Sequence, residues 1–324
     1  MASRSPSASF GGVPAPAKAN WFADLALTRH GLIVRKTGRR IGLAEITPME
    51  LAKFLLYLGY VLAGSAWVRL RHPRGPTVYF APDRPRPWYI IWSAMALGGM
   101  RIARTPEDAD ASVYFEDVTI GKLPAGLPAS AFNAQCTDIS KSRVAILWAE
   151  IAGYPLSIDP GKHRGKAVEK SECNGTHDGR IVTCPCSPMT GRVYQTFVDA
   201  SDGVTAIDLR TTIIGRRPLF VVVKTKPAAK RFSIHNDRVA LIELDEVFSG
   251  EEIDLLTRFA ERMQLDWAAI DVLRDRTSGK IYVVDVNKTD TGPAVDLSWR
   301  DRVKFTTVIT RAFADMVSGR RAPL

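Results

Sequence analysis

Apolar and polar residues follow two different periods along this chain, and together they predict a mixture of strands and helices. Residues that alternate or form short apolar runs, as in β-strands, occur at 77–81, 100–103, 111–115, 166–170, 179–182, 192–198, 205–213, 270–273 and 281–287. Apolar residues recur at helical spacing at 47–70, 87–97, 140–152 and 249–263. Because strands and helices interleave, we expect an α/β fold with a small, partly parallel sheet in residues 77–117.

The predicted helix at 47–70 is the most apolar of these elements. It opens with Thr47 as an N-cap and Pro48 in the first turn. Residues 54–68 carry no charge, but this run is shorter than the roughly 20 residues that cross a membrane. Two interpretations remain open. The helix is either buried in the protein or against a partner, or it is an interfacial membrane helix whose basic residues at 69–74 lie near lipid phosphates.

The order of the elements divides the chain into three parts. Residues 1–20 are rich in Ser, Ala, Pro and Gly and have no periodicity, which predicts a disordered tail. We expect an N-terminal α/β domain at 21–130, which contains the apolar helix, and a larger domain at 131–320. A chain of 324 residues is long enough for two or three such units.

Charge and composition restrict the partners. The net charge of +10 favours acidic partners such as nucleotide phosphates or an anionic membrane face. The sequence has no arginine-rich arm and no nucleic-acid motif, so we expect no nucleic-acid partner. The N-terminal residues lack the apolar core of a secretory signal. We therefore expect a cytoplasmic protein, with peripheral membrane contact through residues 54–68 as the alternative.

The four cysteines are expected to be reduced, because disulfides are rare in a reducing cytoplasm. Three of them, Cys173, Cys184 and Cys186, could join His177 in a Cys3His zinc site. Their spacing matches no usual zinc pattern, so ordinary reduced thiols in a loop are the simpler interpretation.

A hairpin near the C-terminus combines apolar strands with acidic positions. Asp285 and Asn287 are two residues apart on one predicted strand, so their side chains project to the same face. If the turn pairs Asp275 with Ile281, then Asp271 lies directly opposite Asp285 on that face. Opposed carboxylates repel, and a bound divalent cation would offset that cost. An oxygen-only set of this kind suits magnesium.

A glycine-bearing loop comes after the strand that ends at Lys170. Backbone N–H groups around Gly175 and Gly179 could face an anion, with the lysine adding fixed charge beside them. Most loops of this kind are only turns. Three elements later in the chain make this loop more informative: a strand with a polar break at Gln195, then a strand that carries Arg210, and finally the acidic hairpin.

Taken in this order, residues 138–289 resemble the ATP-grasp superfamily, in particular the branch with glutamate-adding peptide ligases and glutathione synthetases. The resemblance implies an α+β ATP-grasp fold in which two subdomains, residues 131–198 and 199–320, clasp ATP. It also implies ATP and Mg2+ as cofactors.

The resemblance assigns a role to each matching residue. Those implied to contact ATP are Lys141, Lys170, Gly175, Thr176, Gln195, Phe197 and Val198. Those implied to hold magnesium are Asp271, Asp285 and Asn287. Arg210 is implied to stabilise the transferring phosphoryl group or a substrate carboxylate. Lys162 and Lys166 remain alternatives to Lys141, and Thr196 stands where family members often carry an acidic residue.

A basic stretch after Val223 contains Lys224, Lys226, Lys230 and Arg231, followed by His235 and Asn236. It is either a solvated loop or a lid or acceptor site for an anionic substrate. In the similar peptide ligases an Arg and an Asn of this region serve the substrate and the metal. The resemblance therefore makes Arg231 and Asn236 further candidates.

The function implied first is an ATP- and magnesium-dependent ligase that joins a carboxylate to an amine, in a small molecule or a peptide, through an acylphosphate. The sequence contains no persuasive Ser/His or Cys/His set, and this chemistry needs no side-chain nucleophile. A kinase on the same scaffold, acting on a small anionic or sugar-like acceptor, is the alternative. A non-catalytic, membrane-associated nucleotide-binding protein is the third possibility.

Overall fold

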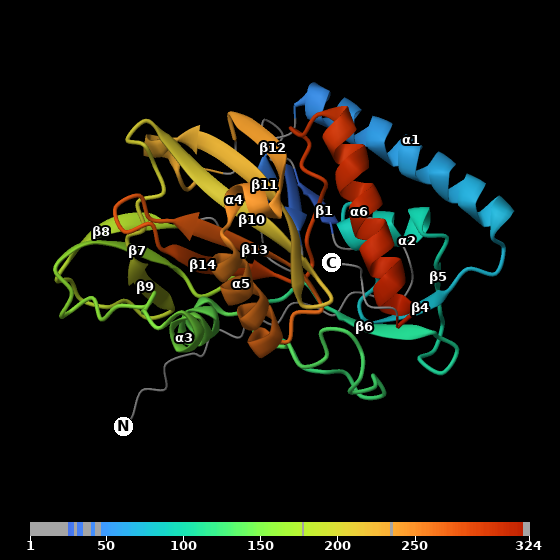
Figure 1. The fold of residues 1–324 in the computed structure, drawn as a ribbon, viewed down its shortest axis with the longest axis horizontal. Coiled ribbons are helices and arrows are strands. Elements are labelled where there is room, and N and C mark those ends of the chain that lie inside the picture. Colours follow the sequence, from blue (N-terminus) through green and yellow to red (C-terminus); the bar gives the residue numbers. More distant parts are fainter. Residues whose placement is uncertain are drawn as a thin grey trace.

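The computed structural model describes residues 25–28, 31–34, 40–42, 47–176, 178–233 and 236–319, and it shows a mixed α/β protein, as predicted (Figure 1). The strands are β1 (Leu25–Thr28), β2 (Gly31–Val34), β3 (Arg40–Gly42), β4 (Thr77–Pro82), β5 (Arg101–Ile102), β6 (Ala111–Phe115), β7 (Gly165–Ser171), β8 (Arg180–Cys184), β9 (Arg192–Thr196), β10 (Thr205–Ile214), β11 (Arg217–Pro227), β12 (Arg238–Glu243), β13 (Trp267–Arg274) and β14 (Ile281–Asn287). The helices are α1 (Pro48–Arg71), α2 (Ile90–Leu97), α3 (Lys141–Ala152), α4 (Leu244–Val247), α5 (Gly250–Met263) and α6 (Trp299–Val317), with a short 3-10 helix, η2, at Ala228–Lys230. The predicted tail at 1–20, His177 and His235 lie outside the described residues.

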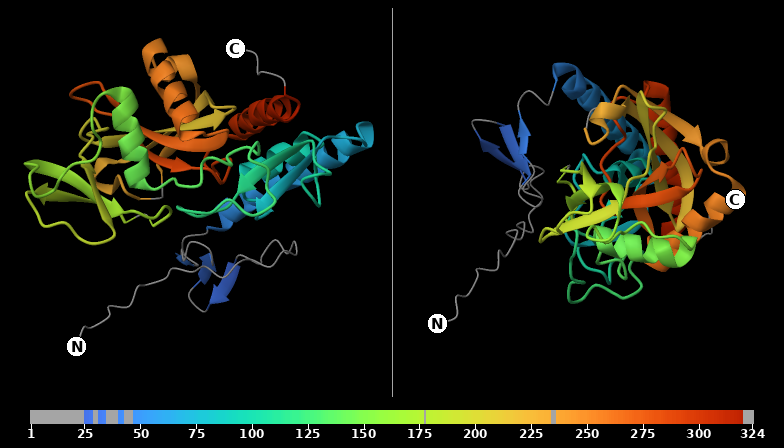
Figure 2. Two further views of the ribbon diagram at one scale, coloured as in Figure 1. Left: turned by 90° about the horizontal axis from the view of Figure 1, so that it is seen from below. Right: turned by 90° about the vertical axis from the view of Figure 1, so that its left-hand side faces the viewer.

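Four sheets are present among the described residues. The largest is antiparallel, in the order β12-β11-β10-β13-β14. A second antiparallel sheet has the order β8-β7-β9, and β5-β4-β6 form the parallel sheet expected in residues 77–117. The strands β1, β2 and β3 make a small meander. Figures 1 and 2 place the β8-β7-β9 sheet and helix α1 at opposite ends of the molecule.

One face of the five-stranded sheet is covered by α3 and α5, which lie on the same side of it (Figure 2, left). Inward-facing strand residues such as Ile213, Val221 and Ile270 are fully buried there. The rings of Trp148 and Phe259 meet edge to face between the two helices, with centroids 5.9 Å apart. This apolar layer fixes the sheet and leaves its other face available for polar side chains.

Only part of that other face is covered by apolar groups. Helix α6 and the parallel sheet pack on the end near β11 and β12, where Phe220 and Phe305 have ring centroids 4.9 Å apart. A single hydrophobic cluster there joins residues of the N-terminal region with residues after 199. The predicted domain boundaries stay a prediction. The remainder of this face lies next to the β8-β7-β9 sheet and carries the charged residues of the candidate site.

The helix signals in the sequence are explained by local contacts. Thr47 and Glu50 form a capping box at the start of α1, and Ser249 and Glu252 form another at the start of α5. Helix α2 begins at Ile90, not at residue 87 as predicted. Tyr89, the residue before it, is extended and pairs with Thr291 in an isolated β-bridge. The four predicted helices are therefore present, with one boundary corrected.

Candidate active site

The acidic hairpin brings its two carboxylates together through a register that differs from the predicted one. Arg274, not Asp275, is opposite Ile281. With regular pairing from there, Asp271 would lie opposite Val284 and not opposite Asp285. However, a β-bulge follows between Asp271 and Val272. The bulge restores the predicted opposition of Asp271 and Asp285.

The turn of the hairpin explains the shift. The Asp275 carboxylate accepts hydrogen bonds from the backbone N–H groups of Thr277 and Ser278, at 3.1 and 2.8 Å. Its own N–H donates to the carbonyl of Lys280, at 2.9 Å. Asp275 therefore belongs to the turn, and the strands pair from the residue before it.

The bulge leaves Val284 without a partner on β13 and turns its carbonyl toward β7. The ammonium of Lys170 donates to this carbonyl at 2.8 Å. Burial lowers the pKa of Lys170 to about 8, with the neighbouring Lys141 charge adding to the effect and Asp285 opposing it. The predicted phosphate-binding lysine is thus held beside the acidic hairpin by a backbone acceptor.

Lys141 is the first residue of α3 and is buried. Its ammonium lies 3.8 Å from a carboxylate oxygen of Asp285. It also donates to the carbonyl of Cys173 and to the side-chain oxygen of Asn174, both at 2.9 Å. The alternatives lie elsewhere: Lys162 is exposed and pairs with an aspartate three residues before it, and Lys166 lies over the ring of Phe197.

The glycine loop folds into the same region. Asn174 donates from its side chain to the carbonyl of Val286, at 2.8 Å, while its oxygen accepts from Lys141. Gly175 has φ of +75°, a conformation that other residues rarely adopt. The hydroxyl of Thr176 turns back to Asp178, at 3.1 Å. The loop therefore reaches the acidic hairpin through Asn174, which the sequence did not single out.

Arg210 crosses from β10 to the hairpin. It donates to Asp271 at 2.8 Å and to Asp290 through a second nitrogen. Burial alone would raise the pKa of Asp271, but the charges of Arg210, Lys224 and Lys226 and the hydrogen bond from Arg210 together lower it. Burial would lower the pKa of Arg210, but the charges and hydrogen bonds of these two acids together raise it, so its guanidinium stays charged. Asp290 was missed in the sequence, although it lies only three residues beyond the Asp-x-Asn motif.

Asp285 carries an unsatisfied atom. The carboxylate oxygen that faces Lys141 is fully buried and accepts no hydrogen bond from the residues that the structure describes, although about 30% of the whole side chain is exposed. Burial raises the pKa of Asp285, against the opposing charges of Lys141 and Lys170. Buried polar atoms are normally paired. An ion or ligand would satisfy this one.

The residues predicted to hold magnesium fit that ion chemically. Asp271, Asp285 and Asn287 offer only oxygen atoms, the donors that magnesium prefers. Asn287 already accepts from the N–H of Thr289 at 2.9 Å, which fixes its side chain. Among the residues that the structure describes, no group of three or more His, Cys, Asp or Glu could hold a metal. Phosphate oxygens and water would therefore have to complete the coordination.

The predicted adenine-binding segment lies at the edge of the β8-β7-β9 sheet. Gln195 is buried on β9, and its side-chain nitrogen donates to no acceptor among the described residues. The ring of Phe197 is covered by the guanidinium of Arg231, 4.9 Å from its centroid. Val198 is buried in the apolar cluster under α3 and α5. The side chain of Val198 is thus part of the core, and Gln195 and Phe197 are the polar and aromatic features of this segment.

Arg231 lies with this segment. Besides the ring of Phe197, its described contacts are the carbonyl of Ala228 at 3.0 Å and the carboxylate of Asp199 at 3.5 Å. Asn236, the other candidate of this region, has a buried side-chain oxygen that finds no hydrogen-bond partner in the described part of the chain. The structure therefore places Arg231 near the adenine segment and leaves the role of Asn236 open.

Two lysines of the basic stretch lie on the polar face of the large sheet. Lys226 pairs with Asp208 at 2.7 Å. Burial and the nearby charge of Arg210 lower the pKa of Lys224. A cavity of about 40 Å3 lies beside Arg210, lined by Arg210, Thr212, Val222, Lys224, Asp290, Thr291, Ala294 and Phe305. It extends the cationic surface away from the acidic hairpin.

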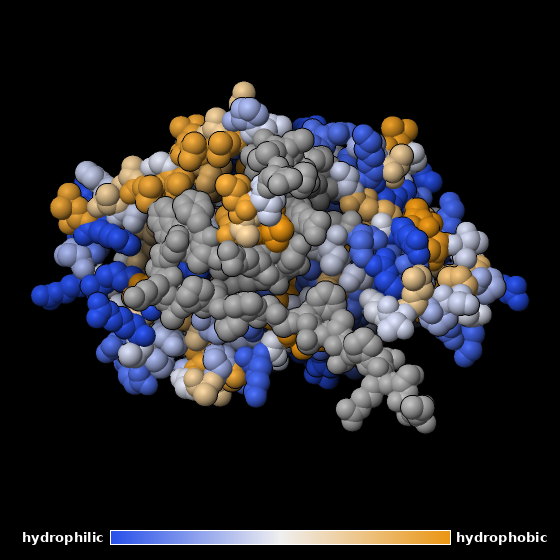
Figure 3. Space-filling view, turned by 180° about the vertical axis from the view of Figure 1, so that it is seen from behind, coloured by the Kyte–Doolittle hydropathy of each residue, from blue (hydrophilic) through white to orange (hydrophobic). Residues whose placement is uncertain are grey.

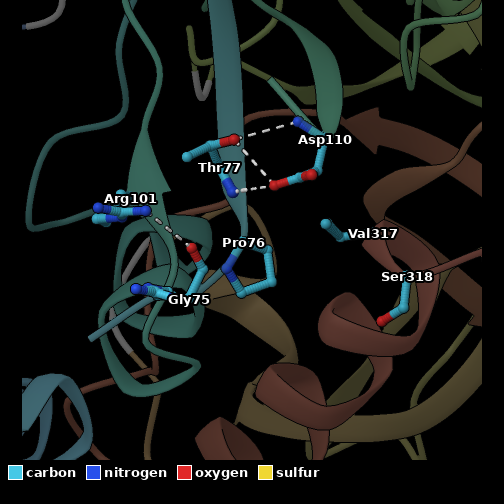
Figure 4. A pocket seen from close by; sticks show the side chains of 8 residues that line it. Gly75, Pro76, Thr77, Arg101, Asp110, Val317 and Ser318 are labelled. Atoms are coloured by element: carbon cyan, nitrogen blue, oxygen red, sulfur yellow. Dashed lines mark hydrogen bonds between the residues drawn. The ribbon is translucent and has the colours of Figure 1, made fainter. Parts of the chain in front are cut away.

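A larger hollow of about 580 Å3 lies apart from these residues. It is lined by Arg74, Gly75, Pro76, Thr77, Arg101, Asp110, Val317 and Ser318. Figure 4 shows Thr77 and Asp110 joined by hydrogen bonds at its side. No residue predicted to bind ATP or magnesium lines it, so size does not identify the site.

The cysteines give no support for zinc within the described residues. Cys184 and Cys186 have sulfur atoms 3.8 Å apart, and Cys173 is exposed with its carbonyl bonded to Lys141. The proposed fourth ligand, His177, lies outside the described residues. The zinc alternative stays a prediction.

No protein-family model matches the sequence, and no curated protein matches it. Among solved structures, the ATP-grasp ligase PsnB complexed with a minimal precursor is 14% identical and matches over 76% of this chain and 98% of that chain, with a TM-score of 0.47. A second PsnB structure, complexed with a phosphomimetic variant of the minimal precursor, Mg and ADP, also matches. That match covers 58% of this chain and only 60% of that chain, with a TM-score of 0.39.

Two further structures are similar at the same level. A RimK domain ATP-grasp protein from Sphaerobacter thermophilus is 16% identical over 75% of this chain and 99% of that chain, with a TM-score of 0.44. The macrocyclase MdnC from Microcystis aeruginosa, bound with precursor peptide MdnA, is 14% identical over 74% and 99%, with a TM-score of 0.45. PsnB and the RimK domain protein are ATP-grasp proteins, the superfamily that the sequence resembles. These sequence identities and TM-scores are low, so a function for this chain has to be argued from the residues of its site.

Proposed function

We propose that this protein is an ATP- and magnesium-dependent ligase that joins a carboxylate to an amine through an acylphosphate. One observation carries the proposal. A buried lysine, a half-buried lysine, an arginine that bridges two aspartates, and two opposed aspartates meet at the β14 side of the large sheet. Charges of both signs in one partly buried place suit a magnesium nucleotide, whose phosphates need cations and whose metal needs carboxylates.

The residues divide into a metal side and a phosphate side. Asp271, Asp285 and Asn287 would hold magnesium, which supplies charge neutralisation to the β- and γ-phosphates when bound. Lys141 and Lys170 would donate to phosphate oxygens from the other side. The Asp285 oxygen that lies 3.8 Å from the Lys141 ammonium supports this division, because it is fully buried and accepts no hydrogen bond from the described residues.

Arg210 would act on the reacting groups. Its two hydrogen bonds to Asp271 and Asp290 fix the plane of the guanidinium. A substrate carboxylate oxygen attacks the γ-phosphorus, the bond to the β,γ-bridging oxygen breaks, and ADP leaves with the electron pair. The amine nitrogen then attacks the acyl carbon, the bond to the phosphate oxygen breaks, and the nitrogen loses a proton. Arg210 would stabilise the negative charge on the phosphoryl and acyl oxygens in both steps.

The thiols give no reason to add a covalent enzyme intermediate. Cys136 is buried, and burial raises the pKa of its thiol to about 12, so it carries almost no thiolate near neutral pH. The cavity beside Arg210 has Lys224 in its wall, and these two cations support the binding of an anionic substrate there. The substrate carboxylate is therefore expected on the Lys224 side of Arg210.

Product analysis tests the proposal. Purified protein is incubated with ATP, Mg2+ and panels of amino acids, sugar acids and short peptides, and ADP, phosphate and amide are measured. Hydroxylamine should trap the acylphosphate as a hydroxamate. Asp285→Asn should reduce turnover about 1,000-fold, whereas Asp254→Asn, on the exposed side of α5, should leave it unchanged. Phosphate found on the acceptor would identify a kinase instead, and ATP binding without any turnover across the panels would contradict an enzyme.

A further inference from the structure

Helix α1 packs on the rest of the protein along one side. Its buried residues are Tyr57, Val61 and Ser65. The hydroxyl of Tyr57 is 2.9 Å from that of Thr306 on α6. Leu97 of α2 lies so close to Gly64 that a Cβ there would approach it to 2.5 Å. One stripe of α1 is therefore fixed to α2 and α6, as Figure 1 shows at the edge of the molecule.

The opposite side of α1 is apolar and exposed. Its exposed fractions are 55% for Leu55, 64% for Leu56, 45% for Leu62, 56% for Trp67 and 78% for Leu70. Residues 54–68 contain no charged side chain. A helix face that water covers normally carries charges, and a continuous apolar surface marks a contact site. Figure 3 shows apolar side chains along the upper left edge, where α1 lies in that view.

The charge around this face is positive at its C-terminal end. Arg69 and Arg71 occupy the last turn, and Arg74 follows within three residues. The guanidinium of Arg71 lies 4.2 Å from the centre of the Trp67 ring. Tryptophan and arginine together are typical of the level at which lipid headgroups meet the acyl chains. This arrangement is complementary to an anionic lipid surface.

The contacts of α1 decide between lying on a membrane and crossing it. The helix has 24 residues and is long and apolar enough to span by length and composition. However, Arg302 donates to the carbonyl of Lys53 at 3.1 Å, and Val68 packs against Gly99 near the other end. A spanning helix would lose these contacts, together with those of Tyr57. The helix is therefore held against the protein along most of its length.

We propose that the outer face of α1 is a docking surface for an anionic membrane leaflet, with the helix in the plane of the interface. Leu55, Leu62 and Trp67 would enter the acyl boundary, and the arginines at 69, 71 and 74 would contact lipid phosphates. This proposal does not depend on the ligase activity, because α1 contributes no residue to the nucleotide site.

Flotation with lipid vesicles tests the proposal on the full chain. Wild-type protein should float with vesicles of phosphatidylglycerol and phosphatidylcholine at low salt, and much less with phosphatidylcholine alone. Leu55→Glu should lower the bound fraction at least tenfold. Ile146→Glu is the matched control, since Ile146 is also an exposed aliphatic residue on a helix, at 52% exposure on α3, and should bind as wild type does.

Charge and folding are tested separately. Arg69→Glu with Arg71→Glu should remove the preference for the anionic vesicles. Thermal unfolding of each variant should match wild type, because every changed side chain is exposed in the structure. Failure of wild type to float with anionic vesicles would overturn the proposal. So would sedimentation showing a wild-type dimer that Leu55→Glu converts to monomer without any vesicle binding, because a second copy would then cover this face.

Discussion

The two faces of the large sheet are built by the same strands and carry opposite kinds of residues. On the face toward α3 and α5, Ile213, Val221 and Ile270 are buried among other apolar groups. On the other face, Arg210 and Asp271, which alternate with such residues along β10 and β13, hold each other by hydrogen bonds. The first face needs no ligand to be stable. The second keeps charges partly out of water, where even paired charges gain little for the fold.

This difference predicts that substitutions on the two faces separate stability from activity. Residues of the apolar face should change the free energy of unfolding without changing the chemistry of folded molecules. Residues of the polar face should change the chemistry more than the stability.

The largest effect is expected for Asp285→Asn. Loss of the carboxylate should reduce kcat about 1,000-fold, equivalent to about 4 kcal/mol of activation free energy, because charge stabilisation dominates phosphoryl transfer. Since burial raises the pKa of Asp285, its ionised form costs the folded state free energy, and the amide should not lower the melting temperature. Initial rates and thermal unfolding measure the two quantities. A fall in melting temperature equal to that of a core variant would contradict the separation.

The next effect is expected on the apolar face. Phe259→Ala removes a fully buried ring that packs against Trp148 and should lower the free energy of unfolding by about 3 kcal/mol or more. Denaturant unfolding measures the change. The kcat of the folded fraction, determined well below the melting temperature, should stay within about twofold of wild type, because distant sites without shared partners act nearly independently.

A smaller effect is expected from pH. Lys170 has a pKa lowered to about 8 by burial and by Lys141, against the charges of Asp285, Asp271 and Glu172. ATP binding should weaken as pH rises through 8, up to about tenfold at pH 9, because the neutral amine no longer pairs with phosphate. Stability should move the other way and rise between pH 8 and the unfolded pKa, since the unfolded chain binds the extra proton there.

Titration of ATP affinity against pH measures this effect. Lys170→Arg provides the control, because arginine stays protonated across the range and should remove the inflection near pH 8. An unchanged inflection in that variant would assign it to another group.

The smallest effect is expected for Asn174→Ala. In the structure the Asn174 oxygen accepts from Lys141, and its nitrogen donates to the hairpin. A phosphate that pairs with Lys141 would compete with this side chain for the donors of the ammonium. Removal of this side chain should therefore tighten ATP binding by about threefold, less than the 1.4 kcal/mol that a factor of ten represents. Calorimetric titration measures the change, and weaker binding would show that Asn174 helps to hold the nucleotide.

Local signals in the sequence predicted much of this architecture. The alternation that placed Asp285 and Asn287 on one face is a property of any strand, and the capping boxes of α1 and α5 depend on residues three positions apart. The opposition of Asp271 and Asp285 was predicted correctly through an incorrect turn. The bulge could not be predicted, because no local pattern in the hairpin marks it, and the Lys170 contact at its carbonyl is long-range.

Long-range contacts account for what the sequence left out. Asp290 belongs to the site because it accepts a hydrogen bond from Arg210, 80 positions earlier, and no local sequence pattern predicts such a pair. Asn174 is one polar residue among several in its loop, and only the contact with Lys141 distinguishes it. Strand β11 and helix α6 were not predicted, although residues 219–223 form an apolar run and residues 299–317 have an amphipathic pattern. The roles of the site residues stay predictions until activity is measured.

The unpaired residue Val284 has a consequence for comparing this chain with distant homologues. A β-bulge is an extra position in one strand only, so a homologue with a regular hairpin would be one residue shorter at that point. An alignment should therefore open its gap at Val284 and leave the spacing between Asp285 and Asn287 intact. A gap placed in the polar turn instead would shift Ile281, Tyr282 and Val283 by one column and match the inward-facing residues of β14 with outward-facing ones.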